Sequence, residues 1–191
     1  MGDNGNRRRR RDAGRLSPLE PRATPHAKGG LMGDLAALTS SDNYFEDFPV
    51  GDAFRHARGK TVTPLENVMI TDMVMNTAQG HFNAHLMEAT PFGGILSYRG
   101  VNFSIVLGLS TQDCCENALA ELGLDNIKLT APVRHGDTLY AYSEVLALAD
   151  ADQPDAGIIT FRHYGYNQRD KLVAQLDRIA LIKRRSHWAD R

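Results

Sequence analysis

The alternation of apolar and polar positions predicts a first strand, a helical middle and a C-terminal half made of strands. The first strand is expected at 54–62. Four later stretches, 126–133, 138–148, 157–166 and 171–183, are rich in β-branched and aromatic residues and are separated by turn-forming residues, a pattern typical of strands. The last three are long and closely connected, which favours antiparallel pairing.

The segment between the first strand and the later ones opens with a helix start signal. Thr63 can accept a hydrogen bond from an early backbone N–H, Pro64 suits the first helical position, and Glu66 completes a capping box. We expect this helix to reach Asn76, a polar residue that closes an apolar stripe on one face. A second, shorter helix is expected at 84–90.

The apolar run 93–109 predicts a third helix, buried on all sides because apolar residues cover most of its circumference. Small residues recur along the run every three or four positions, at Gly93, Ser97, Gly100, Ser104 and Gly108. A face without side-chain bulk would let a sheet approach closely. Because a strand, helices and then an antiparallel run form an α+β order, we expect a curved antiparallel sheet wrapped around this helix.

Composition and charge set the expected limits of the domain. The 191 residues, 42% of them hydrophobic, suffice for one core. We expect a disordered, Arg-rich N-terminal tail at 1–42, one domain at 43–185 and a short C-terminal tail at 186–191. The arginine run 7–11 could contact nucleic acid or anionic lipid, but its polar surroundings lack aromatics and indicate a solvated tail. We therefore expect neither nucleic acid nor a membrane as a partner.

The expected location is the cytoplasm. No apolar run is long enough to cross a bilayer, and the N-terminus lacks the apolar core of a signal peptide. The two cysteines, Cys114 and Cys115, are adjacent. This spacing makes a disulfide framework implausible and favours ordinary packing over a redox role.

One segment carries the candidate chemistry. Residues 75–83 read Met-Asn-Thr-Ala-Gln-Gly-His-Phe-Asn and place an amide and a histidine five positions apart. Followed by Phe92-Gly93 and the apolar run, the segment resembles the signature of the MaoC-like (R)-specific enoyl-CoA hydratases. In that family Gly-Asp-x-Asn-Pro-x-His-x-Asp precedes Phe-Gly and a helix. His81 falls on the histidine of the family, and Asn76 stands in place of its aspartate.

The resemblance extends to one branch of that family. Tyr-Phe-Glu-Asp-Phe at 44–48, Ala-Pro-Val-x-His-Gly-Asp-Thr-Leu at 131–139 and Gly-Tyr-Asn-Gln at 165–168 are similar to the branch that handles mesaconyl-CoA, β-methylmalyl-CoA and itaconyl-CoA. This likeness implies a single hot-dog fold and the reversible hydration of a 2-enoyl-CoA that is short and branched or dicarboxylic. It also implies a homodimer or higher homo-oligomer, which would cover an apolar strand such as 157–161 at a sheet edge. The resemblance implies no cofactor besides the CoA of the substrate.

Two other functions stay open. Besides the change at Asn76, Ala78 and Gln79 replace the Asn-Pro of the family, and Asn83 replaces its second aspartate. A catalytically silent acyl-CoA-binding or scaffold protein would tolerate such changes. A thioesterase of the same fold would need a carboxylate positioned at the thioester.

The resemblance assigns the catalytic roles to Asn76 and His81. In the family an aspartate and a histidine hold the water, and a backbone N–H at the start of the central helix polarises the thioester carbonyl. An amide cannot accept a proton at neutral pH, so Asn76 could orient the water while His81 transfers the proton. Arg99 matches the glycine that supplies the N–H, and any residue except proline can supply one.

The expected substrate-binding residues are Tyr98, Arg99, Gly100 and Asn83. The guanidinium of Arg99 could pair with a substrate carboxylate or point out toward CoA phosphate or solvent. Tyr98 could donate to a carbonyl, although an aromatic on a buried helix is more often a packing residue.

Basic residues on the strands are candidate contacts for CoA phosphate. Lys128 and Arg134 form the expected CoA-binding pair, and Arg162 is a further candidate, although solvated strand edges explain all three as well. His81 and His85 could form half of a metal site. No third ligand has suitable spacing, so no metal is expected.

Overall fold

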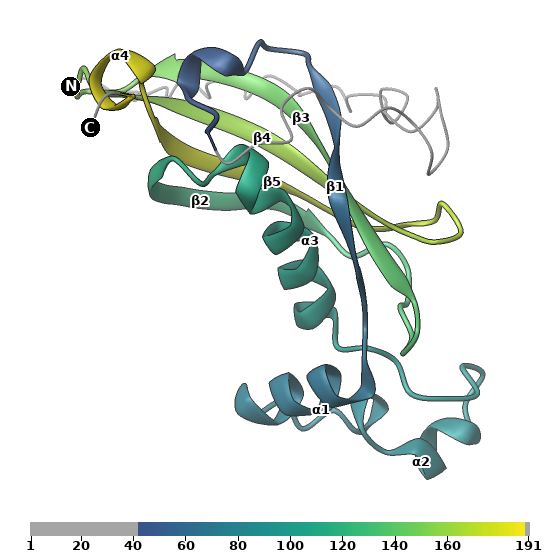
Figure 1. The fold of residues 1–191 in the computed structure, drawn as a ribbon. Helices are drawn as coiled ribbons and strands as arrows, with labels where there is room; N and C mark the ends of the chain where they lie inside the picture. Colours follow the sequence, from purple (N-terminus) through teal and green to yellow (C-terminus); the bar gives the residue numbers. More distant parts are fainter. Residues whose placement is uncertain (1–41, 190–191) are drawn as a thin grey trace, which may run out of the picture.

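The computed structural model describes residues 42–189 and contains one five-stranded antiparallel sheet (Figure 1). The strand order across the sheet is β1-β3-β4-β5-β2. The strands are β1 (Ala53–Thr61), β2 (Ala118–Lys128), β3 (Thr138–Asp150), β4 (Ala156–Asn167) and β5 (Leu172–Lys183). The expected Arg-rich tail at 1–42 lies outside the described residues, except for Asp42.

The three long C-terminal strands are confirmed, and they pair in sequence order. Their central member, β4, lies between β3 and β5. Residues 157–161 therefore lie in the middle of the sheet, and the expectation of an apolar edge there is wrong. The edges are β1 and β2.

The strand expected at 126–133 is misplaced. The observed strand, β2, begins at Ala118 and ends at Lys128. Residues 129–137 are irregular, because Pro132 has no N–H to donate to a ladder and Gly136 has a φ of 87°. This irregular segment passes the start of the central helix instead.

Helix α3 (Arg99–Cys114) lies against the sheet and contacts β1, β3, β4 and β5 (Figure 1). Its buried side includes Val101 and Val106. The expected α+β architecture, an antiparallel sheet around one long helix, is confirmed.

The start of α3 differs from the expectation. The helix begins at Arg99 rather than near position 93. Gly93 takes a positive φ of 63°, and the N–H groups of Leu96 and Ser97 bond outside the helix, to carbonyls of two other segments. These tertiary hydrogen bonds hold residues 94–97 out of the helix.

The exposed face of α3 also differs from the expectation. Ser104 and Gly108 are exposed, so the predictions of a helix buried on all sides and of a sheet against its small residues are wrong. The close approach is made by a glycine of the sheet. A Cβ added at Gly165 of β4 would lie 2.3 Å from a methyl group of Val106, so a larger residue there would push the helix off the sheet.

Helices α1 (Pro64–Met73) and α2 (Ala84–Glu88) lie beyond the end of the sheet, near the N-terminal end of α3 (Figure 1). The capping box is confirmed, because Thr63 and Glu66 bond each other's backbone N–H. Asn76 lies outside the helix, contrary to the expectation. The chain leaves α1 after Met73 because Met75 takes a φ of 56°.

The first and last described segments meet at the opposite end of the sheet (Figure 1). They are the 3-10 helix η2 (Phe45–Asp47) and the short helix α4 (Arg185–Trp188). The backbone N–H of Arg185 donates to Glu46 Oε2 at 3.0 Å. The segment expected as a C-terminal tail, 186–191, thus begins within a helix, and the domain limits stay predictions.

Candidate active site

His81 is the last residue of the 3-10 helix η3 (Gln79–His81), between α1 and α2. Its Nδ1 lies 2.9 Å from the carbonyl oxygen of Leu96. A carbonyl can only accept, so Nδ1 carries a hydrogen and the neutral ring presents an unprotonated Nε2. Within the described part of the chain, Nε2 has no hydrogen-bond partner. An imidazole with a fixed tautomer and one open nitrogen can act as a general base.

The N-terminal end of α3 lies beside this imidazole. Tyr98 is the N-cap residue of the helix, and its ring centroid lies 5.5 Å from that of His81. The Tyr98 side chain makes no capping hydrogen bond within residues 42–189. The first N–H groups of a helix lack an intrahelical partner and favour negative charge. Such donors can stabilise an oxygen that gains negative charge during a reaction.

Gly100 accounts for the position of the Tyr98 ring. A Cβ at position 100 would lie 2.4 Å from Tyr98 Cε1, so glycine is needed where the ring folds over the first turn. Arg99 is exposed, and no ion pair or hydrogen bond engages its guanidinium among residues 42–189. The structure brings these three residues together beside His81, and their contacts with a substrate stay predictions.

Asn76 has its side-chain oxygen engaged locally. Its Oδ1 accepts a hydrogen bond from the N–H of Ala78 at 3.0 Å, a turn that asparagine commonly makes with its own backbone. The amide NH2 of the half-buried side chain is the group that could face a water. No hydrogen bond between Asn76 and His81 occurs among the described residues, so their joint role stays a prediction.

The contacts of Asn83 account for it as a capping residue. Its Oδ1 accepts from the N–H of Leu86 at 3.0 Å and so caps α2. Its Nδ2 donates to Oε1 of Gln79 at 2.6 Å. Both ends of the amide are therefore occupied, and the expected substrate contact stays a prediction.

The three basic candidates for CoA phosphate have different surroundings. The guanidinium of Arg134 donates to the carbonyl of Phe92, near the loop that leads to α3. Lys128 is exposed at the end of the edge strand β2. Arg162 makes two hydrogen bonds to the carboxylate of Asp177, at 2.6 and 2.8 Å, and this pairing raises its pKa. Arg162 is thus occupied by a carboxylate, whereas Lys128 and Arg134 stay candidates.

Sequence reasoning missed Asn67, a fully buried residue of α1. Its Oδ1 accepts from the backbone N–H of Tyr98 at 2.7 Å. Its Nδ2 donates to the carbonyl of His81 at 2.8 Å and to Nε2 of His135 at 3.0 Å. No local pattern marks such a residue, because its partners come from three separate segments.

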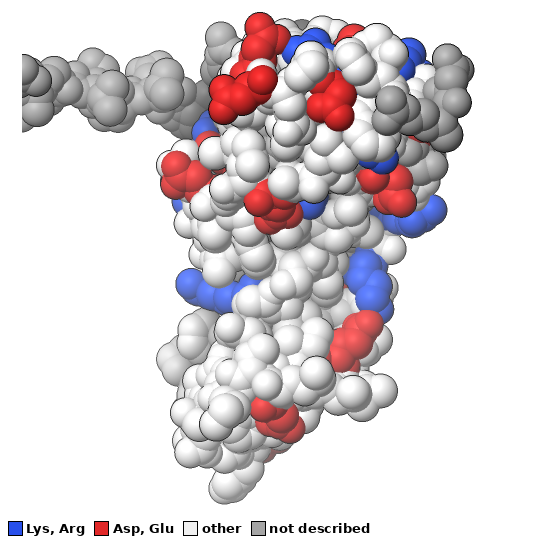
Figure 2. Space-filling view, turned by 90° about the vertical axis from the view of Figure 1, so that its left-hand side faces the viewer, with Lys and Arg blue, Asp and Glu red and all other residues white. Residues whose placement is uncertain are grey.

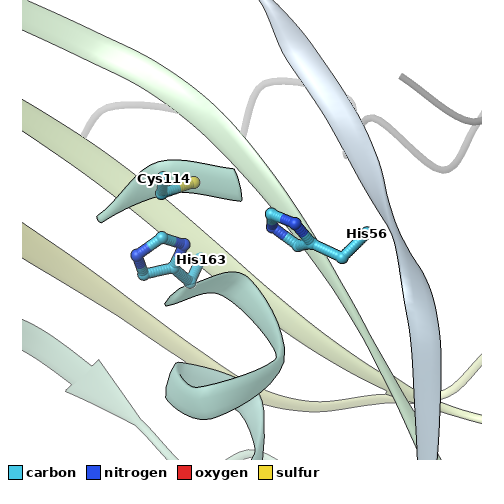
Figure 3. A group of neighbouring side chains, drawn as sticks. All are labelled: His56, Cys114 and His163. Carbon is cyan, nitrogen blue, oxygen red and sulfur yellow. The ribbon is translucent and has the colours of Figure 1, made fainter. Parts of the chain in front are cut away.

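A second group of polar residues gathers at the C-terminal end of α3. His56, Cys114 and His163 each offer one possible metal-ligating atom, and these atoms lie within 4.8 Å of one another. Figure 3 shows the three side chains turned toward a common region. Nitrogen and sulfur donors of this kind are suited to zinc.

The hydroxyl of Ser143 lies between these three side chains. Its Oγ is 2.7 Å from His56 Nε2, 2.6 Å from His163 Nδ1 and 3.5 Å from Cys114 Sγ. The outer nitrogen of His56, Nδ1, is bonded to Asp113 at 2.5 Å. The possible ligands thus converge on a hydroxyl, and hydrogen bonds account for the group. The expectation of no metal stays a prediction.

The two cysteines have the character of packing residues. Both are buried, and neither forms a disulfide. Burial raises the pKa of the Cys115 thiol to about 11 and that of the Cys114 thiol well above its usual value. Since the thiolate is the reactive form, these thiols are poor nucleophiles.

A pocket of about 300 Å³ opens between β1 and α3. Its lining residues are Arg58, Gly59, Lys60, Ile105, Gly108, Leu109 and Gln112. None of the expected site residues is among them, so the pocket is separate from the region around His81.

Comparison with known proteins identifies the family. The family model described as mesaconyl-CoA hydratase matches residues 2–184. The chain belongs to the mesaconyl-CoA hydratase family. This match confirms the branch that the sequence motifs indicated.

Two curated relatives of this family member come from a bacterium and an archaeon. The β-methylmalyl-CoA dehydratase of Chloroflexus aurantiacus is 33% identical over 147 residues, which cover 76% of this chain and 41% of the relative. The mesaconyl-CoA hydratase of Haloarcula marismortui is 30% identical over 191 residues, which cover 89% of this chain and 53% of the relative. The chain thus spans about half the length of the curated relatives it matches.

Solved structures confirm the hot-dog fold. A putative MaoC domain protein dehydratase from Chloroflexus aurantiacus matches with a TM-score of 0.71 and 28% identity, over 80% of this chain and 47% of the other. A Mycobacterium tuberculosis protein described as having a double hotdogfold matches with a TM-score of 0.69 and 25% identity, over 78% of this chain and 46% of the other. The match thus covers about half of each of these two solved chains.

Proposed function

We propose that this protein is an enoyl-CoA hydratase that acts reversibly on a short branched or dicarboxylic acyl-CoA of the mesaconyl-, itaconyl- or β-methylmalyl-CoA type. The observation that carries the proposal is the open Nε2 of His81 beside the uncapped N-terminal end of α3. The names of the curated relatives, a β-methylmalyl-CoA dehydratase and a mesaconyl-CoA hydratase, support the substrate class.

The proposed reaction needs one titratable group. Nε2 of His81 takes a proton from water while the water oxygen bonds to C3 of the enoyl group and the C2–C3 π electrons move toward the thioester. The oxygen that gains charge is stabilised by the N–H groups at the start of α3. The imidazolium then returns the proton to C2, so the atoms balance without a second acid or base. The Asn76 amide orients the water and cannot replace His81 as the base.

Arg99 is proposed to hold the second carboxylate of a dicarboxylic substrate. It occupies the first turn of α3, is exposed, and has no ionic partner among residues 42–189. A guanidinium binds a carboxylate through two parallel hydrogen bonds. The competing interpretation is that Arg99 contacts CoA phosphate or solvent, together with the candidates Lys128 and Arg134.

A second copy of the chain is the proposed partner, in a homodimer or higher homo-oligomer. The relatives have about twice the matched length, and the edge strand β2 exposes Leu119, Leu122, Leu124 and Ile127. On the face that Figure 2 shows, the end that holds α1 and α2 is also mostly uncharged. Pairing of two chains would cover such surfaces, and sedimentation that finds a stable monomer at micromolar concentration would contradict it.

Cofactor and location are the remaining parts of the proposal. The substrate carries the CoA, and no other cofactor is proposed. Over residues 42–189, no helix has both the length and the apolar character to span a bilayer. The cytoplasmic location stays a prediction.

One experiment separates the proposed function from its alternatives. Purified protein is incubated with crotonyl-, mesaconyl- and itaconyl-CoA, and the alkene and the thioester are followed separately. A hydratase consumes the alkene and keeps the thioester. Loss of the thioester would indicate a thioesterase, and binding without loss of either group would indicate a silent acyl-CoA-binding protein.

A further inference from the structure

The side chain of Asn67 is fully buried and joins three segments that are distant in the sequence. Its oxygen accepts from Tyr98 N at 2.7 Å, and its NH2 donates to His81 O at 2.8 Å and His135 Nε2 at 3.0 Å. The NH2 group has two hydrogens, so both are used. One amide thereby bonds the backbone of the proposed base and the residue that begins α3.

The helix that carries this amide is itself well fixed. The capping box of Thr63 and Glu66 closes the first turn of α1. The hydroxyl of Thr71 donates to the carbonyl of Asn67 at 2.6 Å and is also fully buried. Hydrogen bonds in the turn before Asn67 and in the turn after it therefore hold this residue in place.

His135 is the third hydrogen-bond partner of the amide. Its Nε2 accepts from Asn67, and partial burial lowers the pKa of His135, which favours the neutral, accepting ring. A flipped amide would place its oxygen against the carbonyl of His81 and its NH2 against the N–H of Tyr98. Both contacts are repulsive, so a single orientation is compatible with all three partners.

We propose that Asn67 is a positioning residue that sets the distance between the His81 imidazole and the N–H groups at the start of α3, with His135 as the third partner of its amide. This inference rests on the proposed hydration reaction, in which those two groups act on opposite ends of one conjugated system. A misplacement on the order of 1 Å costs about 100-fold in rate. We expect the effect to fall on kcat, because Asn67 is fully buried and offers no surface to bind CoA directly.

The first test is Asn67→Leu, which removes all three hydrogen bonds at similar volume. We expect kcat on mesaconyl-CoA to fall about 100-fold while KM changes by less than about threefold. Ser143→Ala is the matched control, since Ser143 is equally buried but lies among the polar residues at the other end of α3. A folded Asn67→Leu protein with kcat within about threefold of the wild type would overturn the proposal.

The second test keeps Asn67 and changes its third hydrogen-bond partner, so it also works if Asn67→Leu does not fold. His135→Leu removes the acceptor, and we expect a kcat loss of about tenfold. His135→Gln offers a carbonyl oxygen as acceptor and is expected to retain more activity than His135→Leu. Equal losses in both variants would contradict a role for the hydrogen bond between Asn67 and position 135.

A readout without turnover separates this proposal from the proposed function. Butyryl-CoA labelled with 13C at the thioester carbonyl has no alkene and cannot be hydrated. We expect its carbonyl shift to move downfield on binding to the wild type, because N–H donors polarise the carbonyl, and to move less on binding to Asn67→Leu. A wild-type protein that polarises the carbonyl but hydrates no substrate would contradict the proposed function and leave the positioning role intact. Equal carbonyl shifts on binding to the wild type and to Asn67→Leu would contradict the positioning role.

Discussion

The two ends of helix α3 carry histidines in opposite situations. At the C-terminal end, His56 and His163 are 1% and 0% exposed, and each contacts the Ser143 hydroxyl. At the N-terminal end, His81 is partly exposed, with one nitrogen held by a carbonyl and the other open. Burial makes a histidine part of the core, whereas partial exposure with one fixed and one open nitrogen leaves it able to move protons.

The buried end shows that contacts alone do not define a catalytic site. Asp113, His56 and Ser143 are joined in the order of a hydrolase triad, at 2.5 and 2.7 Å. Yet the serine is 0% exposed, so no substrate can reach its hydroxyl. The decisive difference between the two ends of α3 is access to substrate.

Hydrogen-bond capacity also assigns the protons at the buried end. Asp113 accepts from Nδ1 of His56, whose Nε2 then accepts from the Ser143 hydroxyl. That hydroxyl can accept in turn from Nδ1 of His163 and from the Cys114 thiol. The one unpaired nitrogen left by this arrangement, His163 Nε2, is an acceptor. An acceptor without a partner costs less than a buried N–H without one.

The largest effect is expected from removing the open imidazole. His81→Ala should lower turnover by about 10²- to 10⁴-fold, because general acid–base catalysis contributes about that much. Initial rates on mesaconyl-CoA measure the loss. His85→Ala is the matched control, because His85 is exposed on the neighbouring helix α2. Comparable losses of turnover in His81→Ala and His85→Ala would contradict a specific catalytic role for His81.

The next largest effect should depend on the substrate. Arg99→Met is expected to lower kcat/KM on mesaconyl-CoA by about 10- to 100-fold, the value of a lost charge-assisted hydrogen bond. On crotonyl-CoA, which lacks the second carboxylate, the loss should stay below about threefold. Arg58→Met serves as control at another exposed arginine. An equal loss on both substrates would leave Arg99 as a structural or CoA-contacting residue.

At the buried end, the expected loss is in stability. Ser143→Ala leaves His56 and His163 without their shared partner and should lower the free energy of unfolding by about 1–3 kcal/mol. Urea unfolding measures the change, and activity per folded molecule should be retained. If Ser143→Ala instead reduced kcat without loss of stability, the two ends of α3 would be functionally coupled.

The burial of His163 should also make the stability of the protein depend on pH. Burial, which penalises the charged ring, holds the pKa of His163 well below its usual value. The unfolded chain therefore binds this proton more readily. The neutral ring makes its full contribution to the free energy of unfolding above about pH 6.5. This contribution is lost as the pH falls below that value, by up to about 1.4 kcal/mol per pH unit. Unfolding free energies of wild type and His163→Gln between pH 7.5 and 5.5 should converge toward acid pH.

The smallest effect is expected from Asn76→Asp. An aspartate keeps the acceptor for the N–H of Ala78 and adds a negative charge near a dicarboxylic substrate. Repulsion on the order of 1 kcal/mol should lower kcat/KM on mesaconyl-CoA about fivefold. Crotonyl-CoA is the neutral control substrate. Increased activity on both substrates would mean that the site had lost its base rather than specialised for an anionic acyl group.

Local chemistry in the sequence determined several features of this protein. The capping box at Thr63 and Glu66 set the start of α1 because its hydrogen bonds lie within one turn. Alternating β-branched and aromatic residues defined the three long C-terminal strands. The motif around His81 indicated the family and the histidine of the candidate site. These features can be predicted from the sequence because they depend on residues that are neighbours in the chain.

Other features were decided only by the tertiary structure. α3 starts late because Leu96 and Ser97 bond to distant segments, and its small-residue face is open because the sheet approaches through Gly165 instead. The position of β2 and the partners of Asn67 likewise depend on segments far apart in the sequence. A buried polar side chain is stable only when such partners converge on it, and convergence is a property of the fold rather than of any one segment.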